Sequence, residues 1–274
     1  MANKSVRDVL RVTGGDLPEP RSTPTGPKTK SAAVAALPTI GERLADLQEA
    51  LYAESTRAVL LVLQGMDTSG KGGTIKHVVG QLNPLGVKIA SFKKPTRAEL
   101  RHDFLWRIRR QLPTPGHIGV FDRSHYEDVL IARVDNLVPR RDLASRYRAI
   151  NAFEAELAES GITVVKCFLH ISPEAQKERL LARLNEPAKH WKYNPGDLDV
   201  RSKWSQYQEA YAIALERCAT PPWYAIPSDR KWYRNWAVAN ILLETLEELA
   251  PKPPAPDFDV ADQINRLTNH DPLG

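Results

Sequence analysis

The sequence has little of what marks secreted, disulfide-stabilised or membrane-spanning proteins. Its 274 residues include only two cysteines, Cys167 and Cys218, which are too few for a disulfide framework. No run of about 18 apolar residues occurs, so a transmembrane helix is not expected. The first residues contain no apolar segment of the kind that forms a secretory signal. These absences predict a cytoplasmic protein with no membrane partner.

The charge balance is mildly basic. The chain has 38 lysines and arginines against 33 aspartates and glutamates, for a formal net charge of +5. Such a surplus suits an anionic partner, but it does not distinguish among nucleic acid, a nucleotide and polyphosphate. The sequence shows no recognition helix and no series of stacking aromatic residues, so nucleic-acid binding is not expected.

The order of apolar and amphipathic segments predicts one α/β domain. Five short apolar segments alternate with helical patterns, which is typical of a parallel sheet with helices on both faces. The domain is expected to span residues 35–250, after a mobile arm at 1–34 and before a loose proline-rich tail at 251–274. An arginine-rich helix is expected over 97–110. The expected strands are 59–64, 87–92, 118–121, 164–171 and 223–226.

A glycine-rich loop follows the first expected strand and has the spacing G-x-x-x-x-G-K. Its glycines allow backbone N–H groups to converge on an anion, and Lys71 at the start of the next helix adds a full positive charge. An ordinary glycine-rich turn is the alternative, but it gives Lys71 no role. The sequence therefore predicts a phosphate site formed by Gly65, Met66, Thr68, Ser69, Gly70, Lys71, Gly72, Gly73 and Thr74.

Two aspartates lie at positions where a bound cation would be needed to balance their negative charge. Asp67 lies inside the loop, where its charge would repel a phosphate, and Gly72 replaces the Ser or Thr that ligates magnesium in most such loops. Asp122 closes the strand 118–121, a position at which phosphate-loop enzymes organise their metal. We therefore expect Asp67 and Asp122 to hold Mg²⁺, with Mn²⁺ as an alternative. Simple capping of the helix is the alternative role for Asp67.

Cationic residues are expected around this loop. Arg123 follows Asp122 directly, and a guanidinium suits the bidentate geometry of phosphate oxygens. Lys93 and Lys94 come after the second strand, on the side of an open sheet where ligands bind. The polar segment within residues 177–199, interrupted by proline and glycine, predicts a mobile lid that excludes water, although an ordinary surface loop is the alternative. For His125, a structural hydrogen-bonded role is preferred over that of a base.

Four segments together resemble the polyphosphate kinase 2 family. They are the loop at 65–74, Asp-Arg-Ser-His-Tyr-Glu-Asp at 122–128, Arg-Leu-Asn-Glu-Pro-Ala-Lys-His-Trp-Lys-Tyr at 183–193 and Trp-Tyr-Arg-Asn-Trp at 232–236. The resemblance implies a P-loop kinase fold like that of thymidylate kinase, with a helical lid, and a homodimer or homotetramer. It implies magnesium-dependent transfer of phosphoryl groups between inorganic polyphosphate and a nucleotide. The residues implied in catalysis or binding are Asp67, Lys71, Asp122, Arg123, Glu127, Arg183, Lys189 and Lys192.

The residues at 125–128 resemble those of family members that phosphorylate both AMP and ADP, with GMP and GDP left open. The reaction exchanges one phosphoanhydride for another, so it is expected to run in both directions. A nucleotide phosphate is an anionic nucleophile, so the site needs no strong general base. Three alternatives stay open: a monophosphate kinase that uses ATP, a polyphosphate kinase that accepts ADP only, and an anion-binding module without turnover.

Overall fold

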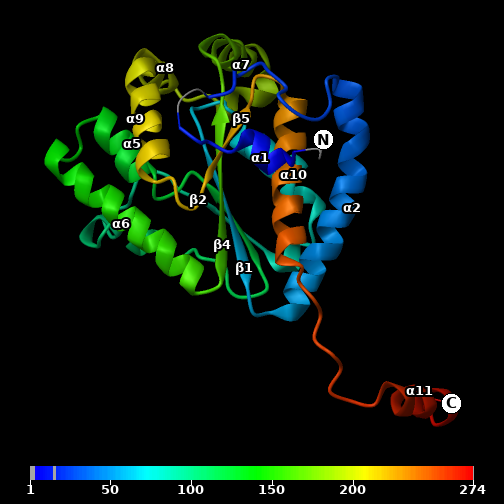
Figure 1. Ribbon diagram of the computed structural model, residues 1–274. Coiled ribbons are helices and arrows are strands. Elements are labelled where there is room, and N and C mark those ends of the chain that lie inside the picture. Colours follow the sequence, from blue (N-terminus) through cyan, green and yellow to red (C-terminus); the bar gives the residue numbers. More distant parts are fainter. Residues whose placement is uncertain (1–3, 15–16, 274) are drawn as a thin grey trace.

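The computed structural model describes residues 4–14 and 17–273. Within this part of the chain, one five-stranded parallel sheet is covered by helices on both faces (Figure 1). The strand order is β2-β3-β1-β4-β5, and every pair of neighbouring strands is parallel. This architecture confirms the α/β prediction. The strands are β1 (Ala58–Gln64), β2 (Val87–Ser91), β3 (Ile118–Asp122), β4 (Ile162–His170) and β5 (Trp223–Pro227).

Two apolar cores lie on the two faces of the sheet. The helices α5, α6 and α9 pack over one core, and α1, α2, α3 and α10 pack over the other. The segment predicted to act as a lid comprises α7, the 3₁₀ helix at Pro187–Lys192 and α8. The described helices are α1 (Val6–Leu10), α2 (Lys30–Glu54), α3 (Lys71–His77), α4 (Trp106–Arg109), α5 (Glu127–Val134), α6 (Arg140–Glu159), α7 (Pro173–Asn185), α8 (Asp197–Ser202), α9 (Trp204–Arg217), α10 (Lys231–Leu249) and α11 (Val260–Asn269).

The central strand β1 explains why the sequence begins its phosphate motif with a continuous apolar run. Leu60 and Val62 belong to one core, whereas Val59, Leu61 and Leu63 belong to the other, and all five are fully buried. Successive side chains of a strand point to opposite faces, so a strand covered on both faces needs apolar residues at every position. β1 lies between β3 and β4 and therefore delivers the glycine loop to the middle of one sheet edge.

The segment before residue 35 packs against the domain, contrary to the prediction of a mobile arm. Val6 and Leu10 of α1 are 8% and 1% exposed and join the core formed with α10 and β5. The backbone N–H of Val6 donates to Glu244 of α10 at 2.8 Å. Two apolar residues one helical turn apart are a weak signal in a polar sequence, which is why the packing was not expected. Residues 1–3 and 15–16 of the predicted arm lie outside the described residues.

The stretch from residue 17 to α2 also contacts the domain. The N–H of Asp229, in the loop after β5, donates to the carbonyl of Pro20 at 3.0 Å. A ring nitrogen of His170, at the end of β4, lies 3.1 Å from the carbonyl of Pro18. The helix α2 begins at Lys30, inside the predicted arm, with Thr29 as its N-cap. The stretch 17–29 therefore lies across the ends of β4 and β5.

Two further predictions of secondary structure were wrong. Residues 97–110 form only a 3₁₀ turn at Glu99–Arg101 and the short helix α4. The carboxylate of Asp103 accepts the N–H of Leu105 at 2.9 Å, a local bond that competes with a continuous helix. The expected loose tail contains the helix α11, which stands apart from the domain (Figure 1). None of the described helices combines the length and apolarity that crossing a membrane requires.

Candidate active site

The carboxyl ends of β1 and β3 bring the predicted residues to one edge of the sheet. Leu63 of β1 pairs with Asp122 of β3, and the N–H of Arg123 donates to the carbonyl of Leu63 at 3.1 Å. The glycine loop and the acid that closes β3 therefore lie side by side. Ligands of open α/β sheets bind at this edge.

The loop curls because several of its residues have positive φ angles. Gly65 has a φ of 149° and Gly70 a φ of 114°, and Thr68 adopts a φ of 64°. A Cβ on Gly70 would lie 1.6 Å from Nη1 of Arg234, so the close approach of this buried side chain requires glycine. Lys71 follows at the start of α3, and its Nζ donates to the carbonyl of Gly65 at 2.8 Å. The loop thus wraps around its own lysine.

Three hydroxyl oxygens of the loop region are buried without a hydrogen-bond partner among the described residues. They belong to Thr68, Ser69 and Thr74. Buried polar atoms in folded proteins are nearly always paired. These hydroxyls therefore point to a polar group that the site takes up, and they support the assignment of the loop to phosphate binding.

Asp67 faces Arg123 across the mouth of the loop. Nη2 of Arg123 donates to Oδ1 of Asp67 at 2.6 Å, with the two side chains 33% and 23% exposed. Burial alone would raise the pKa of Asp67, but the positive charges of Lys71 and Arg123 outweigh it and lower the pKa. Burial lowers the pKa of Lys71 more than the charge of Asp67 raises it. Asp67 is therefore a carboxylate whose second oxygen, Oδ2, makes no hydrogen bond within the described residues.

The residues after Asp122 form a polar support for the site. Oγ of Ser124 donates to Oε1 of Gln64 at 3.1 Å, and Nε2 of Gln64 donates to Glu127 at 3.0 Å. Burial opposes the charge of Arg123, yet Asp67 and Glu127 together raise the pKa of its guanidinium. Ser124 is thus engaged in holding the end of β1, which leaves no arrangement for a serine nucleophile.

His125 belongs to a fully buried network with Glu154 of α6 and Lys166 of β4. Its Nε2 lies 3.2 Å from Glu154, whose other oxygen accepts from Nζ of Lys166 at 2.6 Å. The hydroxyl of Tyr126 also donates to Glu154, at 2.8 Å. Burial alone would raise the pKa of Glu154, but the bond with His125 and the charge of Lys166 lower it. The structural role predicted for His125 is confirmed.

The lid covers the carboxyl ends of the strands at the top of Figure 1. Nη1 of Arg183 donates to the carbonyl of Lys192 at 2.9 Å and lies 3.2 Å from Asp197, and its charge contributes to the lowered pKa of Asp67. Lys189 pairs with Glu186 on the lid surface. The structure therefore places Arg183 where its charge acts on Asp67 and leaves Lys189 partly exposed and Lys192 exposed to solvent.

Lys93 and Lys94 are exposed in the segment after β2. β2 is separated from β1 by β3, so the two lysines lie to one side of the glycine loop. No hydrogen bond or ion pair joins either side chain to the loop in the described parts of the chain. They are placed at the correct edge of the sheet but at its periphery.

Comparison with known proteins identifies the family of this chain. A sequence model described as polyphosphate kinase 2 matches residues 28–254. The chain belongs to the polyphosphate kinase 2 family. An AMP/ADP-polyphosphate phosphotransferase from Meiothermus ruber is 51% identical over 230 residues, covering 83% of this chain and 86% of that protein. An ADP-polyphosphate phosphotransferase from Rhodopseudomonas palustris is 45% identical over 222 residues, covering 76% and 77%.

A solved structure is similar to this chain in three dimensions as well. The crystal structure of polyphosphate kinase 2 from Arthrobacter aurescens matches with a TM-score of 0.94 at 47% identity, and the match covers 97% of both chains. Membership in the polyphosphate kinase 2 family confirms the resemblance seen in the sequence, together with the P-loop kinase fold and the enzyme class that it implies.

Two arginines of this polyphosphate kinase 2 chain contact the loop but were not among its predicted site residues. Nη1 of Arg179 donates to the carbonyl of Thr68 at 2.8 Å, and its Nη2 donates to the carbonyl of Ser228 at 2.6 Å. Nη1 of Arg234 donates to the carbonyl of Ser69 at 3.1 Å. Both guanidiniums donate to carbonyl groups of the loop and so do not occupy its N–H groups, of which that of Ser69 donates to the carbonyl of Met66 at 3.0 Å.

Sequence signals for both arginines were present. Arg179 lies one helical turn before Arg183 on α7 and so shares its face. Arg234 is the central residue of the segment 232–236, which carried part of the resemblance. Arg234 is 2% exposed, and burial and the charge of Arg179 lower its pKa. Among the described residues, neither arginine has a carboxylate at salt-bridge distance, so positive charge is left uncompensated beneath the loop.

A divalent metal is a general requirement of phosphoryl-transfer enzymes. The carboxylates of Asp67 and Asp122 both act on Lys71 from the mouth of the loop. No group of three metal-ligating side chains occurs within the described residues. Two carboxylates suit a hard cation that takes its remaining ligands from substrate phosphates and water. The donor set therefore fits a metal that binds together with substrate.

Proposed function

We propose that this chain transfers phosphoryl groups reversibly between inorganic polyphosphate and the adenine nucleotides AMP and ADP. The observation that carries the proposal is the pair formed by Asp67 and Arg123 at the mouth of the phosphate loop. A carboxylate is out of place in a loop that grips a single triphosphate. Between two polyanionic substrates, it can hold a metal that keeps their phosphates together. The names of the Meiothermus ruber and Rhodopseudomonas palustris relatives support this substrate class.

In the proposed reaction, the loop N–H groups and Lys71 hold the phosphates on one side of the transferred group. Arg123 contacts the transferred group itself, and Arg183 approaches from the lid. Asp67 and Asp122 hold Mg²⁺, with Mn²⁺ as the alternative, which neutralises phosphate charge when bound. The terminal phosphate of AMP or ADP attacks as an anion, so positioning and charge stabilisation supply most of the catalysis.

The outer cations and Glu127 have supporting roles in this proposal. Closure of the lid brings Lys189 and Lys192 from solvent toward the polyphosphate chain. Lys93 and Lys94 contact phosphates farther from the reacting centre. Glu127, held by Gln64, lies on the nucleotide side of Arg123. Lid closure also excludes water, which would otherwise compete with the nucleotide as acceptor.

The test is a product assay without ATP. The protein is incubated with polyphosphate and magnesium and with AMP, ADP, GMP or GDP, and the nucleotides are separated by ion-exchange chromatography. We expect ADP and ATP from AMP, and ATP from ADP. Conversion of ADP alone would identify a diphosphate-specific enzyme. Absence of any product from AMP and ADP, with conversion of AMP when ATP is supplied, would refute the proposal and identify a monophosphate kinase.

We further propose that the protein acts in the cytoplasm as a homodimer or homotetramer. Both substrates of the proposed reaction are intracellular polyanions, and the described chain contains no helix suited to the membrane. Sedimentation velocity of the purified protein tests the assembly.

A further inference from the structure

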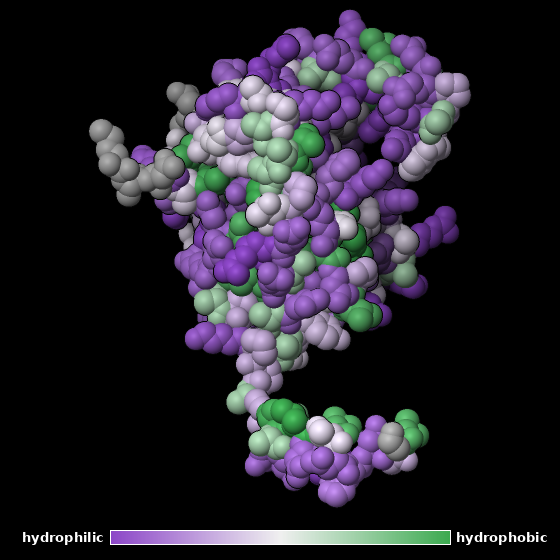
Figure 2. All heavy atoms as spheres, turned by 90° about the vertical axis from the view of Figure 1, so that its right-hand side faces the viewer, coloured by the Kyte–Doolittle hydropathy of each residue, from purple (hydrophilic) through white to green (hydrophobic). Residues whose placement is uncertain are grey.

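The helix α11 has an apolar face with nothing packed against it. Val260, Ile264 and Leu267 recur one helical turn apart and are 47%, 60% and 69% exposed. Figure 2 shows apolar atoms gathered on one side of α11 and polar atoms on the other, across a gap from the domain. No hydrogen bond joins α11 to the domain in the described structure. An isolated helix of ten residues is marginal in water, so this one requires a partner surface.

The linker before α11 leads the chain away from its own domain. Four prolines between residues 251 and 256 favour an extended conformation. The linker is fixed at its start, because Pro251 is buried and the N–H of Lys252 donates to Glu54 at 3.2 Å. The stretch from 253 to 259 spans about 20 Å at the rise of about 3.1 Å per residue of extended proline-rich chain. A return of α11 to its own domain would need a sharp reversal within this stiff segment.

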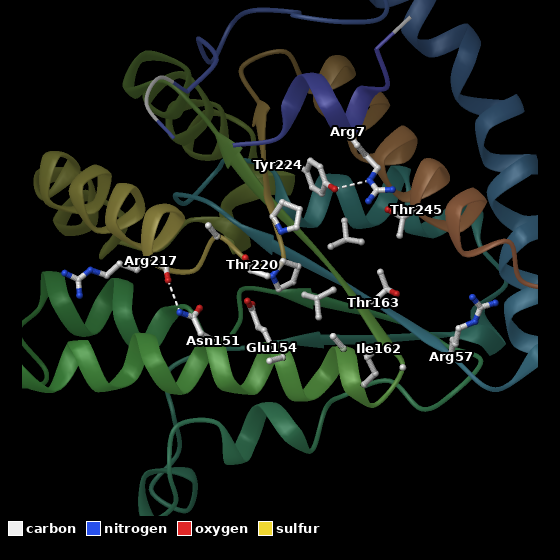
Figure 3. A pocket seen from close by; sticks show the side chains of 18 of the residues that line it. Arg7, Arg57, Asn151, Glu154, Ile162, Thr163, Arg217, Thr220, Tyr224 and Thr245 are labelled. Carbon is white, nitrogen blue, oxygen red and sulfur yellow. Dashed lines mark hydrogen bonds between the residues drawn. The ribbon is translucent and has the colours of Figure 1, made fainter. Parts of the chain in front are cut away.

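A groove of about 760 Å³ lies at the end of the sheet opposite the active site. It is bounded by α6 below, by the first residues of β4, and by the loop before β5 (Figure 3). Ala155 and Ala158 of α6 and Ile162 of β4 provide an apolar floor. The groove is distinct from the phosphate site, because it adjoins the amino end of β4 whereas the loop lies at the carboxyl ends. Its volume accommodates several apolar side chains of a helix.

The charges of the groove leave one arginine available to a partner. Residues 251–274 contain four aspartates against one lysine and one arginine, a net charge of −2. The groove is lined by Arg7, Arg57 and Arg217, which Figure 3 shows at separate points around it, and also by Glu154 and Glu216. Arg7 and Arg57 already pair with Glu248 and Glu54. Arg217 lies over the ring of Tyr147 and has no carboxylate partner among the described residues. The helix α11 itself carries one acid, Asp262, and one base, Arg266, so it matches the groove mainly through its apolar face, with Arg217 available to the acidic residues that flank the helix.

We propose that α11 docks into the groove of a second copy of this chain, which returns its own α11, so that two copies are joined by reciprocal exchange. Exchange of a terminal element is a low-cost route to a symmetric dimer, because the same contact forms twice. An amphipathic helix in a groove buries its apolar stripe at i, i+4 and i+7 spacing, as Val260, Ile264 and Leu267 provide. The inference deepens the proposed assembly but is independent of the chemistry at the phosphate loop.

The match to the Arthrobacter aurescens structure supports a defined position for this segment. It covers 97% of this chain, which leaves about eight residues unmatched, and α11 begins fifteen residues before the end. The matched region therefore reaches into α11 even if every unmatched residue lies at the C-terminus. The segment that forms α11 therefore has, at least in part, an aligned counterpart in a related chain.

The first test is sedimentation velocity of the full chain and three variants. Wild type is expected at twice the chain mass or more. Ile264→Asp with Leu267→Asp should halve that mass and weaken assembly at least about a hundredfold, because each buried apolar side chain contributes about tenfold or more. Asn265→Asp with Asn269→Asp places the same two charges on the opposite face and should leave the mass unchanged. Ala155→Glu with Ala158→Glu, in the groove, should act like the first variant.

A cross-linking experiment identifies the occupant of the groove. One preparation carries Leu267→Cys and another carries Ala158→Cys, and the two are mixed with a short bismaleimide. The native cysteines, Cys167 and Cys218, are fully buried and should not react. Exchange predicts a cross-linked pair with one chain of each kind. An internal cross-link formed only when both substitutions are in one chain would overturn the proposal in favour of docking on the same copy. A monomeric wild type would also overturn it, and phosphotransferase activity in the same samples keeps this result separate from the proposed function.

Discussion

Replacing Asp67 by asparagine separates the charge of this side chain from its shape. The amide oxygen can still accept from Arg123, so the main loss is electrostatic. The two groups lie 2.6 Å apart, but both side chains retain between a quarter and a third of their exposure. Solvent screening limits the contribution of such a pair to about 1 kcal/mol of unfolding free energy. Urea unfolding should therefore show a modest loss of stability, of about that size.

The loss of activity should be far larger. If Asp67 and Asp122 together hold the metal, removal of one carboxylate is expected to lower kcat/KM at least about a hundredfold, equivalent to about 2.7 kcal/mol. The variant should recover part of its activity as the magnesium concentration rises, because weaker metal binding is offset by mass action. The assay is the initial rate of ATP formation from ADP and polyphosphate over a range of magnesium concentrations.

Asp135→Asn is a matched control. Asp135 also pairs at 2.6 Å, with Lys203, but the pair is exposed and outside the active site. We expect a comparable or smaller loss of stability and no change in kcat/KM. Turnover by Asp67→Asn within about threefold of wild type at low magnesium would refute the metal role assigned to Asp67.

The same substitution has a defined pH signature. The pKa of Asp67 is lowered from its ordinary value of 3.8 in the folded protein. Its contribution to stability is therefore present in full above the unfolded pKa and is lost as the pH falls through the lower folded pKa. The difference in unfolding free energy between wild type and Asp67→Asn should be constant near neutrality and should vanish in strong acid. A difference that instead grew below pH about 4 would contradict the sign of the shift.

Three further substitutions test other parts of the structure. Arg234→Met should change the unfolding free energy by no more than about 1 kcal/mol, because relief of a desolvated charge offsets lost hydrogen bonds. It should lower kcat/KM about thirtyfold, since a buried cation about 7 Å from a phosphate contributes about 2 kcal/mol at an effective dielectric constant of about 20. Thermal melts and initial rates, with Arg234→Lys as the control that keeps the charge, would separate the two effects. Gly70→Ala should cost about 2 kcal/mol in urea unfolding, from its positive φ and the collision with Arg234, whereas Gly72→Ala, whose Cβ would meet open space, should leave stability nearly unchanged. Glu154→Gln should lower the unfolding free energy by about 3 kcal/mol, because it leaves the buried ammonium of Lys166 without a counterion. If Glu154→Gln destabilised a Lys166→Met background equally, this ion pair would not be the cause.

The central sheet and the loop were predictable because their causes are local in the sequence. A strand buried on both faces must be apolar at every position, which made β1 visible, and the loop spacing follows from the need to converge N–H groups on a phosphate. That Asp67 and Arg123 lie at one site was predictable, because two strand ends meet at one sheet edge, but their ion pair was not predicted. These features need only the order of elements and the rules of parallel sheets.

The remaining features depend on distant partners. The bond between Asp103 and Leu105 interrupts a segment whose arginines and apolar residues otherwise fit a helix. The role of Arg234 arises from its position beneath Gly70, which no local pattern reveals. Val6 and Leu10 are ordinary residues of a polar segment until α10 and β5 are placed against them.

The packing of the N-terminal segment has a consequence for how the chain folds. Val6 is bonded to Glu244, 238 positions later, so α1 leaves the ribosome long before the helix that it packs against. Contacts of such long separation form late, because the intervening chain must already be ordered. When α1 emerges, the surface of β5 and α10 that receives it does not yet exist, and residues 6–10 remain accessible to chaperones and proteases. The docking of α1 is thus a natural final step of folding, and it reports that the whole domain has been completed.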